Sequence, residues 1–379
     1  MNLPIYCLII TEIARIIKTR KHRDKMLKQQ TKIHSSLRTV EWKNNAVVMI
    51  DQTKLPNKLV YVRYKNYRDV AKAIKTLVVR GAPAIGVSGA FGLALAALQS
   101  KAKSKDKLLE DLEKARKILF ATRPTAINLA WGLEKIMQVA KNNNDVSEIR
   151  KSVVEFAKRM AEEDVEVNMR MGKHGAQLLE NNDTIMTHCN AGALATVGYG
   201  TALGVIRATK ESGKKIKVIA TETRPVMQGS RLTAFELKHD GIDVSLIPDT
   251  AVGYVMSKGL VTKVIVGADR ILRTGHVYNK IGTYQVATMA KQHKIPFYVA
   301  APLSTFDLKS NLEDVIIENR KASEVTMIAG KKTAPDDIEV LNPAFDLTPP
   351  ELITGIITEA GVAKPPFDES IKKLFESNL

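Results

Sequence analysis

The stretch TIMTHCNAG (residues 184–192) decides the fold. It begins with an apolar and β-branched run of the length of a strand, and small, polar and reactive residues follow at once. Such runs recur down the chain and alternate with segments of helical periodicity. This alternation is typical of a parallel, Rossmann-like sheet with helices on both faces. Strands are predicted at 184–188, 217–221, 243–247, 263–266 and 296–299, and helices at 194–210, 229–238 and 250–257.

Upstream of this region the pattern is different. Three β-branched or aromatic runs at 40–42, 46–51 and 60–64 predict a small sheet. From Tyr67 onward, apolar residues recur at helical spacing, which predicts a group of amphipathic helices. A chain of 379 residues is expected to form two domains. We therefore predict an α/β protein with an N-terminal small β and helical domain at 26–180 and a Rossmann-like catalytic domain at 181–379.

The first 25 residues differ from the rest of the chain. Residues 2–17 are mostly apolar and residues 18–25 are strongly basic. The apolar run is too short to span a bilayer, and a signal peptide would carry its charge before that run. Two interpretations remain, a peripheral amphipathic helix or a start site placed too early in a protein that begins at Met26. We favour the second, so residues 1–25 are a doubtful extension and no membrane partner is expected.

The formal net charge of +17 suits nucleic acid, an acidic surface or a small anionic substrate. Basic and acidic residues are interspersed and aromatic residues make up only 5% of the chain, so a nucleic-acid partner is not expected. The two cysteines, Cys7 and Cys189, make no disulfide framework, which favours a reducing cytoplasm. The sequence has neither a metal-ligand motif nor a nucleotide-binding glycine loop, so no cofactor is predicted.

Reactive side chains follow the predicted strands, where parallel sheets hold their ligands. Cys189 lies between a strand and a predicted helix start, and a helix N-terminus lowers a thiol pKa; a buried structural cysteine is the alternative. Asp269 ends an apolar strand, where low-dielectric surroundings raise a carboxyl pKa and suit proton transfer; capping or pairing with Arg270 is the alternative. Asp249 has a similar place, but capping explains it equally well. His188 is interpreted as a packed strand residue.

Three further segments offer groups that bind anions. RGAPAIG (80–86) precedes a helix rich in glycine and alanine, and a helix N-terminus attracts phosphate. Close helix packing is the alternative for this segment. The two roles are compatible, because Arg80 can bind an anion while the small residues after it pack closely. TRPT (122–125) and NKIG (279–282) each place a cation close to a predicted helix. Each signal is weak alone, and together they predict an anion-binding site.

These segments resemble the S-methyl-5-thioribose-1-phosphate isomerases of methionine salvage, a branch of the superfamily that includes the translation initiation factor 2B alpha, beta and delta subunits. The resemblance runs from about Ser36 to Val362 and leaves out residues 1–25. It is carried by RGAPAIG (80–86), TRPTAINLAW (122–131), HCNAGALATVGYGTALG (188–204), TETRP (221–225), QGSRLTAFEL (228–237), GADRI (267–271), NKIGTYQVA (279–287) and NPAFDLTPPELITGIITE (342–359).

The resemblance implies an isomerase that converts S-methyl-5-thio-α-D-ribose 1-phosphate to S-methyl-5-thio-D-ribulose 1-phosphate. It implies a homodimer that needs neither metal nor nucleotide. Cys189 and Asp269 would be catalytic, with Asp269 as the proton donor. The phosphorylated pentose would be held by Arg80, Gly81, Ala82, Arg123, Gln228, Asn279 and Lys280.

Two related functions remain open. Archaeal ribose-1,5-bisphosphate isomerases take a substrate with a second phosphate in place of the methylthio group, and an apolar or cationic pocket facing C5 would discriminate. Non-catalytic regulatory subunits of translation initiation should lack the cysteine and the aspartate, and both are present here, at Cys189 and Asp269. The RGAP, TRPT and NPAFD segments favour the methylthioribose branch. Whether Cys189 acts as a base or shapes a dry pocket for a hydride shift stays open.

Overall fold

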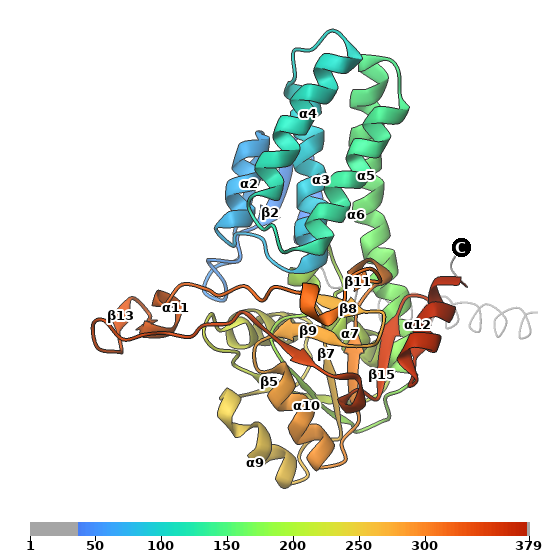
Figure 1. Cartoon of the computed structure of the whole chain (residues 1–379). Helices are drawn as coiled ribbons and strands as arrows, with labels where there is room; N and C mark the ends of the chain where they lie inside the picture. Colours follow the sequence, from blue (N-terminus) through green and yellow to red (C-terminus); the bar gives the residue numbers. More distant parts are fainter. Residues whose placement is uncertain (1–36, 377–379) are drawn as a thin grey trace, which may run out of the picture. The chain divides into compact units, whose positions relative to one another are not determined.

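The main sheet has seven strands in the order β16-β15-β10-β7-β4-β5-β6 in a computed structural model that describes residues 37–376 (Figure 1). All neighbours pair in parallel except β15 and β16. The central strands are buried and rich in Val, Ile and Ala, as expected where helices cover both faces of a sheet. The five strands predicted here are confirmed to within one residue at each end. The strands are β4 (Thr184–Thr187), β5 (Lys217–Thr221), β6 (Val244–Ile247), β7 (Lys263–Val266), β10 (Phe297–Ala300), β15 (Gly355–Thr358) and β16 (Gly361–Ala363).

The prediction of one helix over 194–210 is wrong. A short 3₁₀ turn, Ala193–Ala195, is followed by a loop, and the α-helix begins only at Ala202. Gly200 has φ +88°, and a Cβ there would lie 2.4 Å from the carbonyl carbon of Gly192. The loop therefore folds back on itself at a position where only glycine fits. The helices around the sheet are α7 (Ala202–Glu211), α8 (Ala234–His239), α9 (Val252–Ser257), α10 (Thr283–Gln292) and α12 (Phe367–Glu376), and a π-helical turn, Gly229–Thr233, leads into α8.

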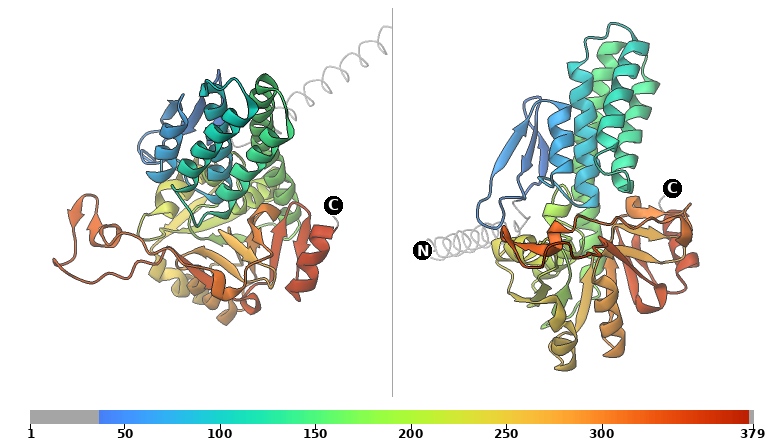
Figure 2. Two further views of the ribbon diagram at one scale, coloured as in Figure 1. Left: turned by 45° about the horizontal axis from the view of Figure 1, so that its top comes forward. Right: turned by 60° about the vertical axis from the view of Figure 1, so that its left-hand side comes forward.

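The N-terminal described part is a small antiparallel sheet packed beside a group of helices, as predicted (Figure 2). Its central helix, α3, is apolar and long enough to cross a membrane, but 78% of it is buried inside the fold. Glycines let α5 approach closely, because a Cβ on Gly86 would lie 2.7 Å from the Asn128 carbonyl oxygen. The elements are β1 (Val40–Trp42), β2 (Val47–Ile50), β3 (Tyr61–Tyr64), α2 (Tyr67–Lys75), α3 (Ala82–Gln99), α4 (Lys105–Phe120), α5 (Ile127–Asn142) and α6 (Val146–Ala176).

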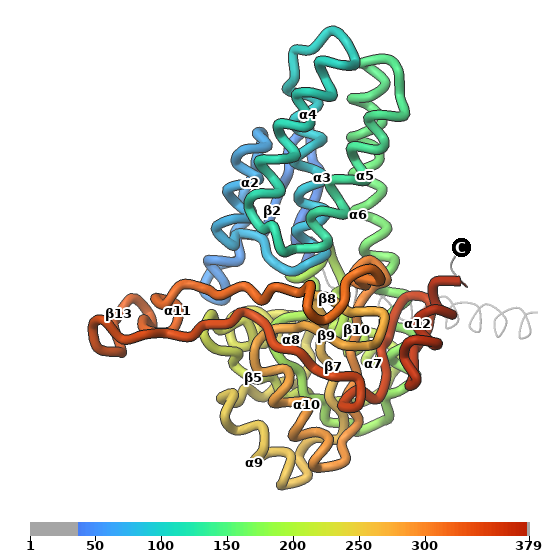
Figure 3. The backbone as a smooth tube through the Cα atoms, viewed as in Figure 1, coloured from blue at the N-terminus to red at the C-terminus, as the bar shows by residue number. Residues whose placement is uncertain are grey.

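A second small sheet, in the order β11-β8-β9-β14, lies across the ends of the main strands. It holds Asp269 in place, because the Asp269 N–H donates to the Tyr278 carbonyl at 2.9 Å. The chain leaves this sheet after β11 and returns at β14. We call this segment, residues 308–344, the excursion (Figure 3). The elements are β8 (Arg270–Leu272), β9 (Val277–Lys280), β11 (Phe306–Asp307) and β14 (Phe345–Thr348), with α11 (Ser323–Thr326), β12 (Met327–Ile328) and β13 (Lys331–Lys332) in the excursion.

The fold of residues 37–376 is thus mixed α/β. One apolar cluster fills the helical part and others lie on the faces of the main sheet. Helix α6 connects them, since it packs on α3 and on α7. The division into domains at 26–180 and 181–379 stays a prediction. The predictions about residues 1–25 and Met26 concern positions outside the described residues.

Candidate active site

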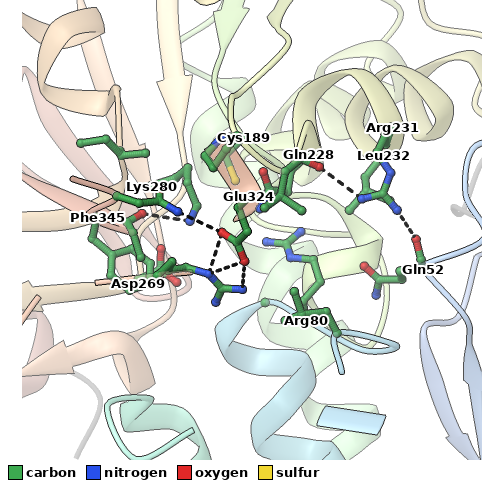
Figure 4. Close-up of a pocket in the computed structure, with 18 of the residues that line it drawn as sticks. Gln52, Arg80, Cys189, Gln228, Arg231, Leu232, Asp269, Lys280, Glu324 and Phe345 are labelled. Carbon is green, nitrogen blue, oxygen red and sulfur yellow. Dashed lines mark hydrogen bonds and ion pairs between the residues drawn. The ribbon is translucent and has the colours of Figure 1, made fainter. Parts of the chain in front are cut away.

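A cavity of about 220 Å³ lies where the helical part, the main sheet and the excursion meet (Figure 4). Seven of the nine residues implied by the resemblance line it. They come from segments as far apart in the sequence as Arg80 and Lys280. The cavity is thus formed where parallel strands end, as the sheet topology leads one to expect. These seven residues are Arg80, Gly81, Arg123, Cys189, Gln228, Asp269 and Lys280.

The other two residues of that set do not line the cavity. Ala82 is the first residue of α3 and faces a neighbouring small cavity. Asn279 is buried, with 5% of its surface exposed, and its Nδ2 donates to Thr283 Oγ1 at 3.0 Å. Each is next in the chain to a cavity residue, Gly81 or Lys280.

Cys189 is buried at the end of β4 with a backbone φ of +62°. Two threonines fix this conformation: Thr223 Oγ1 accepts from the Cys189 N–H at 2.9 Å, and Thr233 Oγ1 donates to its carbonyl at 2.6 Å. The expected lowering of the thiol pKa by a helix N-terminus is wrong, because no α-helix begins at this point. Burial raises the pKa of the Cys189 thiol, although the charges of Arg80 and Lys280 act in the opposite direction.

Asp269 follows β7 and is enclosed by the second small sheet. Burial raises the pKa of its carboxyl group, against the lowering effect of Lys280, Arg80 and Arg123. The direction predicted from the sequence is confirmed. A carboxyl group that keeps its proton at higher pH is suited to donate that proton.

Lys280 lies opposite, at the end of β9. Its Nζ donates to the Ala344 carbonyl at 2.9 Å and lies 4.9 Å from the centre of the Phe345 ring. Burial lowers the pKa of this amine, while Cys189 and Asp269 raise it. Cys189, Asp269 and Lys280 all line the cavity, so the thiol, the carboxyl group and the amine lie around one space (Figure 4).

The Arg80 guanidinium group is held by two hydrogen bonds to Asn190. Its two terminal nitrogens donate to Asn190 Oδ1 at 2.6 Å and to the Asn190 carbonyl at 3.0 Å. Arg123 pairs more loosely with Glu318 of the excursion, at 3.3 Å. Two guanidinium groups in one cavity suit a bidentate anion such as a phosphate.

Several polar atoms in the cavity lack partners within the described part of the chain. They are Gln52 Oε1, Gln228 Oε1 and Arg123 Nε, each buried without a hydrogen bond. Buried polar atoms are nearly always hydrogen-bonded, so unsatisfied ones grouped in one cavity indicate a polar ligand. A ligand with several hydroxyl and phosphate oxygens satisfies donors and acceptors alike.

The sequence analysis missed part of the lining. Arg320 and Glu324 of the excursion pair through Nη2 and Oε1 at 2.7 Å and face the cavity. Gln52 and Arg231 lie at the opposite wall, where Arg231 Nη2 donates to the Gln52 carbonyl at 2.7 Å. The residues around Arg320 and Gln52 have no periodic pattern, so only the tertiary structure shows that they belong to the site.

Two other candidates have structural roles. His188 contacts Thr221 Oγ1 at 2.7 Å and the Ile281 carbonyl at 2.8 Å, as a packed strand histidine would. Asp249 accepts the N–H groups of Thr223 at 2.8 Å and Arg224 at 2.6 Å, so it fixes the loop after β5. Within residues 37–376, no cluster of His, Cys, Asp or Glu is arranged to hold a metal ion.

The chain is similar to proteins of known family. The model of the initiation factor 2 subunit family matches residues 78–365. A methylthioribose-1-phosphate isomerase of Thermosipho melanesiensis is 53% identical over 339 residues, which are 89% of this chain and 98% of that protein.

Two solved structures share the fold. The 5-methylthioribose 1-phosphate isomerase of Pyrococcus horikoshii OT3 has a TM-score of 0.84 and 47% identity, over 91% of this chain and 97% of that one. A chain from A. fulgidus, described as subunit delta of the translation initiation factor eIF-2B, has a TM-score of 0.82 and 51% identity, over 90% and 100% of the two chains.

Proposed function

The chain belongs to the initiation factor 2 subunit family, and from this and its cavity we propose that it is a methylthioribose-1-phosphate isomerase. It converts S-methyl-5-thio-α-D-ribose 1-phosphate to S-methyl-5-thio-D-ribulose 1-phosphate in methionine salvage. The observation that carries this proposal is the grouping of Cys189, Asp269 and Lys280 with four arginines in one cavity. Non-catalytic relatives have no need for a buried thiol beside a buried acid.

The substrate is a furanose locked by its 1-phosphate, so the ring must open before isomerisation. Asp269 donates its proton to the ring oxygen, and the bond from C1 to that oxygen breaks with its electron pair remaining on oxygen. C1 is left as an oxocarbenium ion stabilised by its phosphate-bearing oxygen. A hydride then moves from C2 to C1, and the 2-hydroxyl becomes the ketone as it returns a proton to the Asp269 carboxylate. Protons and electrons balance over this cycle.

The protein's part in this reaction is binding, proton transfer and exclusion of water. Arg80 and Arg123 bind the phosphate and thereby fix C1 and C2. Gln228 binds a sugar hydroxyl through its unsatisfied Oε1. Cys189, whose raised pKa keeps the thiol neutral, forms a dry wall beside the migrating hydride.

The lining also supports the choice of substrate. Leu77, Leu232 and Phe345 give the cavity apolar surface suited to a methylthio group. The Glu324 carboxylate faces the same space but is paired with Arg320. The apolar surface is therefore the feature that favours the methylthio substrate over ribose 1,5-bisphosphate.

We infer a Rossmann-like catalytic part, a homodimer and a cytoplasmic location, without a metal or nucleotide cofactor. The parallel strand order and the similarity to the P. horikoshii structure support the first of these. The second candidate function, a regulatory subunit of translation initiation, is kept because of the likeness to the A. fulgidus chain.

One assay tests the function. The purified chain is incubated with methylthioribose 1-phosphate and, separately, with ribose 1,5-bisphosphate, and ketose formation is followed by phosphorus NMR. We expect conversion of the first substrate and at least about tenfold lower kcat/KM for the second, because a phosphate in place of the methylthio group would lie against apolar surface. Equal or higher turnover of the bisphosphate would assign the chain to the other isomerase. Turnover of neither would favour the regulatory role.

A further inference from the structure

A second cavity, of about 360 Å³, is lined by residues other than those of the candidate active site. Helices α3, α5 and α6 form one wall, and the loop after β10, the end of β15 and helix α12 form the other. Contacts of α6 with β15 and β16 hold the two walls together, and Figure 1 shows the lower end of α6 beside β15. The volume is within the range of small-molecule sites.

The charged groups in this cavity are all acidic. Glu163, Asp164 and Glu359 line it, and no lysine, arginine or histidine is among its lining residues. This is unexpected in a chain whose net charge is +17. Burial raises the pKa of Asp164 to about 7 and also raises that of Glu359, although Arg38 and Arg170 act to lower them.

These carboxylates have only part of their hydrogen-bonding capacity in use. Asp164 Oδ2 accepts the Val197 N–H at 2.7 Å, while Oδ1 accepts no hydrogen bond from the described residues. The two Glu359 oxygens share the Leu303 N–H, at 3.2 and 3.1 Å, and the carboxylate also accepts from the Glu359 N–H. A carboxylate can accept about four hydrogen bonds, so both have room for a donor.

An independent observation also indicates a ligand with donors. Asn128 is 2% exposed and lines the cavity. Its Nδ2 donates to Ser304 Oγ at 3.3 Å, but its Oδ1 has no partner within residues 37–376. A buried acceptor of this kind needs a donor from outside the chain.

The rest of the wall is apolar. Trp131, Met160 and Phe375 contribute aromatic and thioether surface, and Val87 closes the floor on α3. Trp131 is 39% exposed, so part of its ring is open to a ligand. Aromatic and thioether groups bind an apolar body, and aromatic rings also attract a cation.

We propose that this second cavity binds a small organic cation, in which an ammonium or amidinium group is attached to an apolar body. The cationic group donates to Asp164, Glu359 and Asn128 Oδ1, and the body packs on Trp131, Met160 and Phe375. Anionic ligands are excluded by the three carboxylates. The site is distinct from the substrate cavity, because the two share no lining residue.

The test measures binding to the full chain by calorimetry with 2-phenylethylammonium, with neutral 2-phenylethanol as the matched probe. We expect saturable one-to-one binding of the ammonium, at least about tenfold tighter than the alcohol, as for a charge-assisted hydrogen bond. Saturating inorganic phosphate should not displace the ammonium. Equal affinity for the two probes, or displacement by phosphate, would overturn the proposal.

Variants locate the site. Glu163→Gln, Asp164→Asn and Glu359→Gln keep the size of the side chain but remove its charge and one acceptor oxygen, and each should weaken ammonium binding by about fivefold or more. Glu155→Gln is the control, because it removes the same charge from an exposed position on the same helix, outside the cavity, where Glu155 pairs with Lys158. Melting curves verify folding, and Glu163, being exposed, is the variant least expected to unfold. Unchanged binding in all three variants, or equal weakening in Glu155→Gln, would contradict the assignment.

Discussion

Glu236 Oε1 accepts a hydrogen bond from Asn190 Nδ2 at 2.9 Å, one residue after Cys189. The same carboxylate accepts the N–H groups of Ala193 and Leu194 and pairs with Arg207 at 2.7 Å, with both charged side chains fully buried. Asn190 in turn accepts from Arg80. The Glu236 carboxylate, which is buried outside the cavity, therefore fixes both the conformation of the loop after Cys189 and the orientation of the Arg80 side chain.

Glu236→Gln should weaken both folding and catalysis. The substitution leaves the buried Arg207 with only Asp240 as an ionic partner, and we expect a loss of about 3 kcal/mol in the free energy of unfolding. It also replaces a carboxylate that accepts from four donors with an amide that brings a donor of its own. Urea unfolding measures the first effect and steady-state kinetics the second.

The kinetic readout separates positioning from general destabilisation. Displacement of the Asn190–Arg80 pair should raise KM as well as lower kcat at a temperature where the variant is folded. Glu155→Gln is the control, since it removes an exposed carboxylate on α6. Unchanged kinetics of the folded Glu236→Gln variant would show that the network is structural only.

Cys189→Ser and Asp269→Asn should each lose most activity while still binding substrate. Removing a positioned proton donor costs about 10²–10⁴-fold in kcat, so Asp269→Asn should fall in that range. Cys189→Ser places a more polar group against the reacting carbons and should also lower kcat strongly. Calorimetry with methylthioribose 1-phosphate checks that binding remains. Near-normal turnover in either variant would refute its assigned role.

The pH dependence of kcat follows from the raised pKa of Asp269. The donor works when protonated, so kcat should be highest at low pH and fall as pH rises through the folded-state pKa, which lies above the usual value for aspartate. A kcat that increases with pH over the whole range in which the fold is stable would contradict the acid role of Asp269.

The raised thiol pKa of Cys189 predicts that iodoacetamide reacts with it slowly at neutral pH and faster as pH rises.

Isotope transfer distinguishes the two routes left open for Cys189. The neutral thiol in a buried wall favours the hydride shift, and the reaction in deuterium oxide should therefore place no solvent deuterium at C1 of the product. Proton NMR of the purified ketose measures this. Substantial deuterium at C1 would instead show that a base, Cys189 as its thiolate, removes the C2 proton.

Gly81→Ala should disrupt the site. Gly81 has φ +93°, and a Cβ there would lie 2.3 Å from the Ala195 carbonyl oxygen, so the 80–83 and 193–196 segments must move apart. Gly213→Ala is a matched control, because Gly213 has φ +87° but nothing within 4 Å of the added Cβ. The control should lose about 1–2 kcal/mol from backbone strain alone.

We expect Gly81→Ala to lose more stability than the control and to raise KM, because Arg80 precedes the displaced backbone. Thermal unfolding and steady-state kinetics of the two variants decide this. Equal effects in both would mean that the close approach of Ala195 can relax without affecting the site.

The parts of the site that follow strands could be predicted from the sequence. Cys189 and Asp269 each follow an apolar run, and a parallel sheet brings the ends of such runs together. The direction of the Cys189 pKa shift could not be predicted. A loop stands before Ala202 in place of the expected helix, and burial therefore determines that the thiol pKa is raised. Arg320 and Glu324 could not be found either, because their positions depend on pairing across the excursion and not on a local pattern.

The excursion is closed at its base by hydrogen bonds between its two stems. The Arg320 N–H donates to the Asn342 carbonyl and the Ala344 N–H donates to the Glu318 carbonyl, both at 2.8 Å. Every cavity residue of this segment belongs to the stems or to the turn of α11, and none comes from the tip beyond β12. The length of the tip is therefore independent of the chemistry. Gly330, at φ +80° with open space around it, is a place where a reporter peptide can be inserted without moving the residues that hold the sugar.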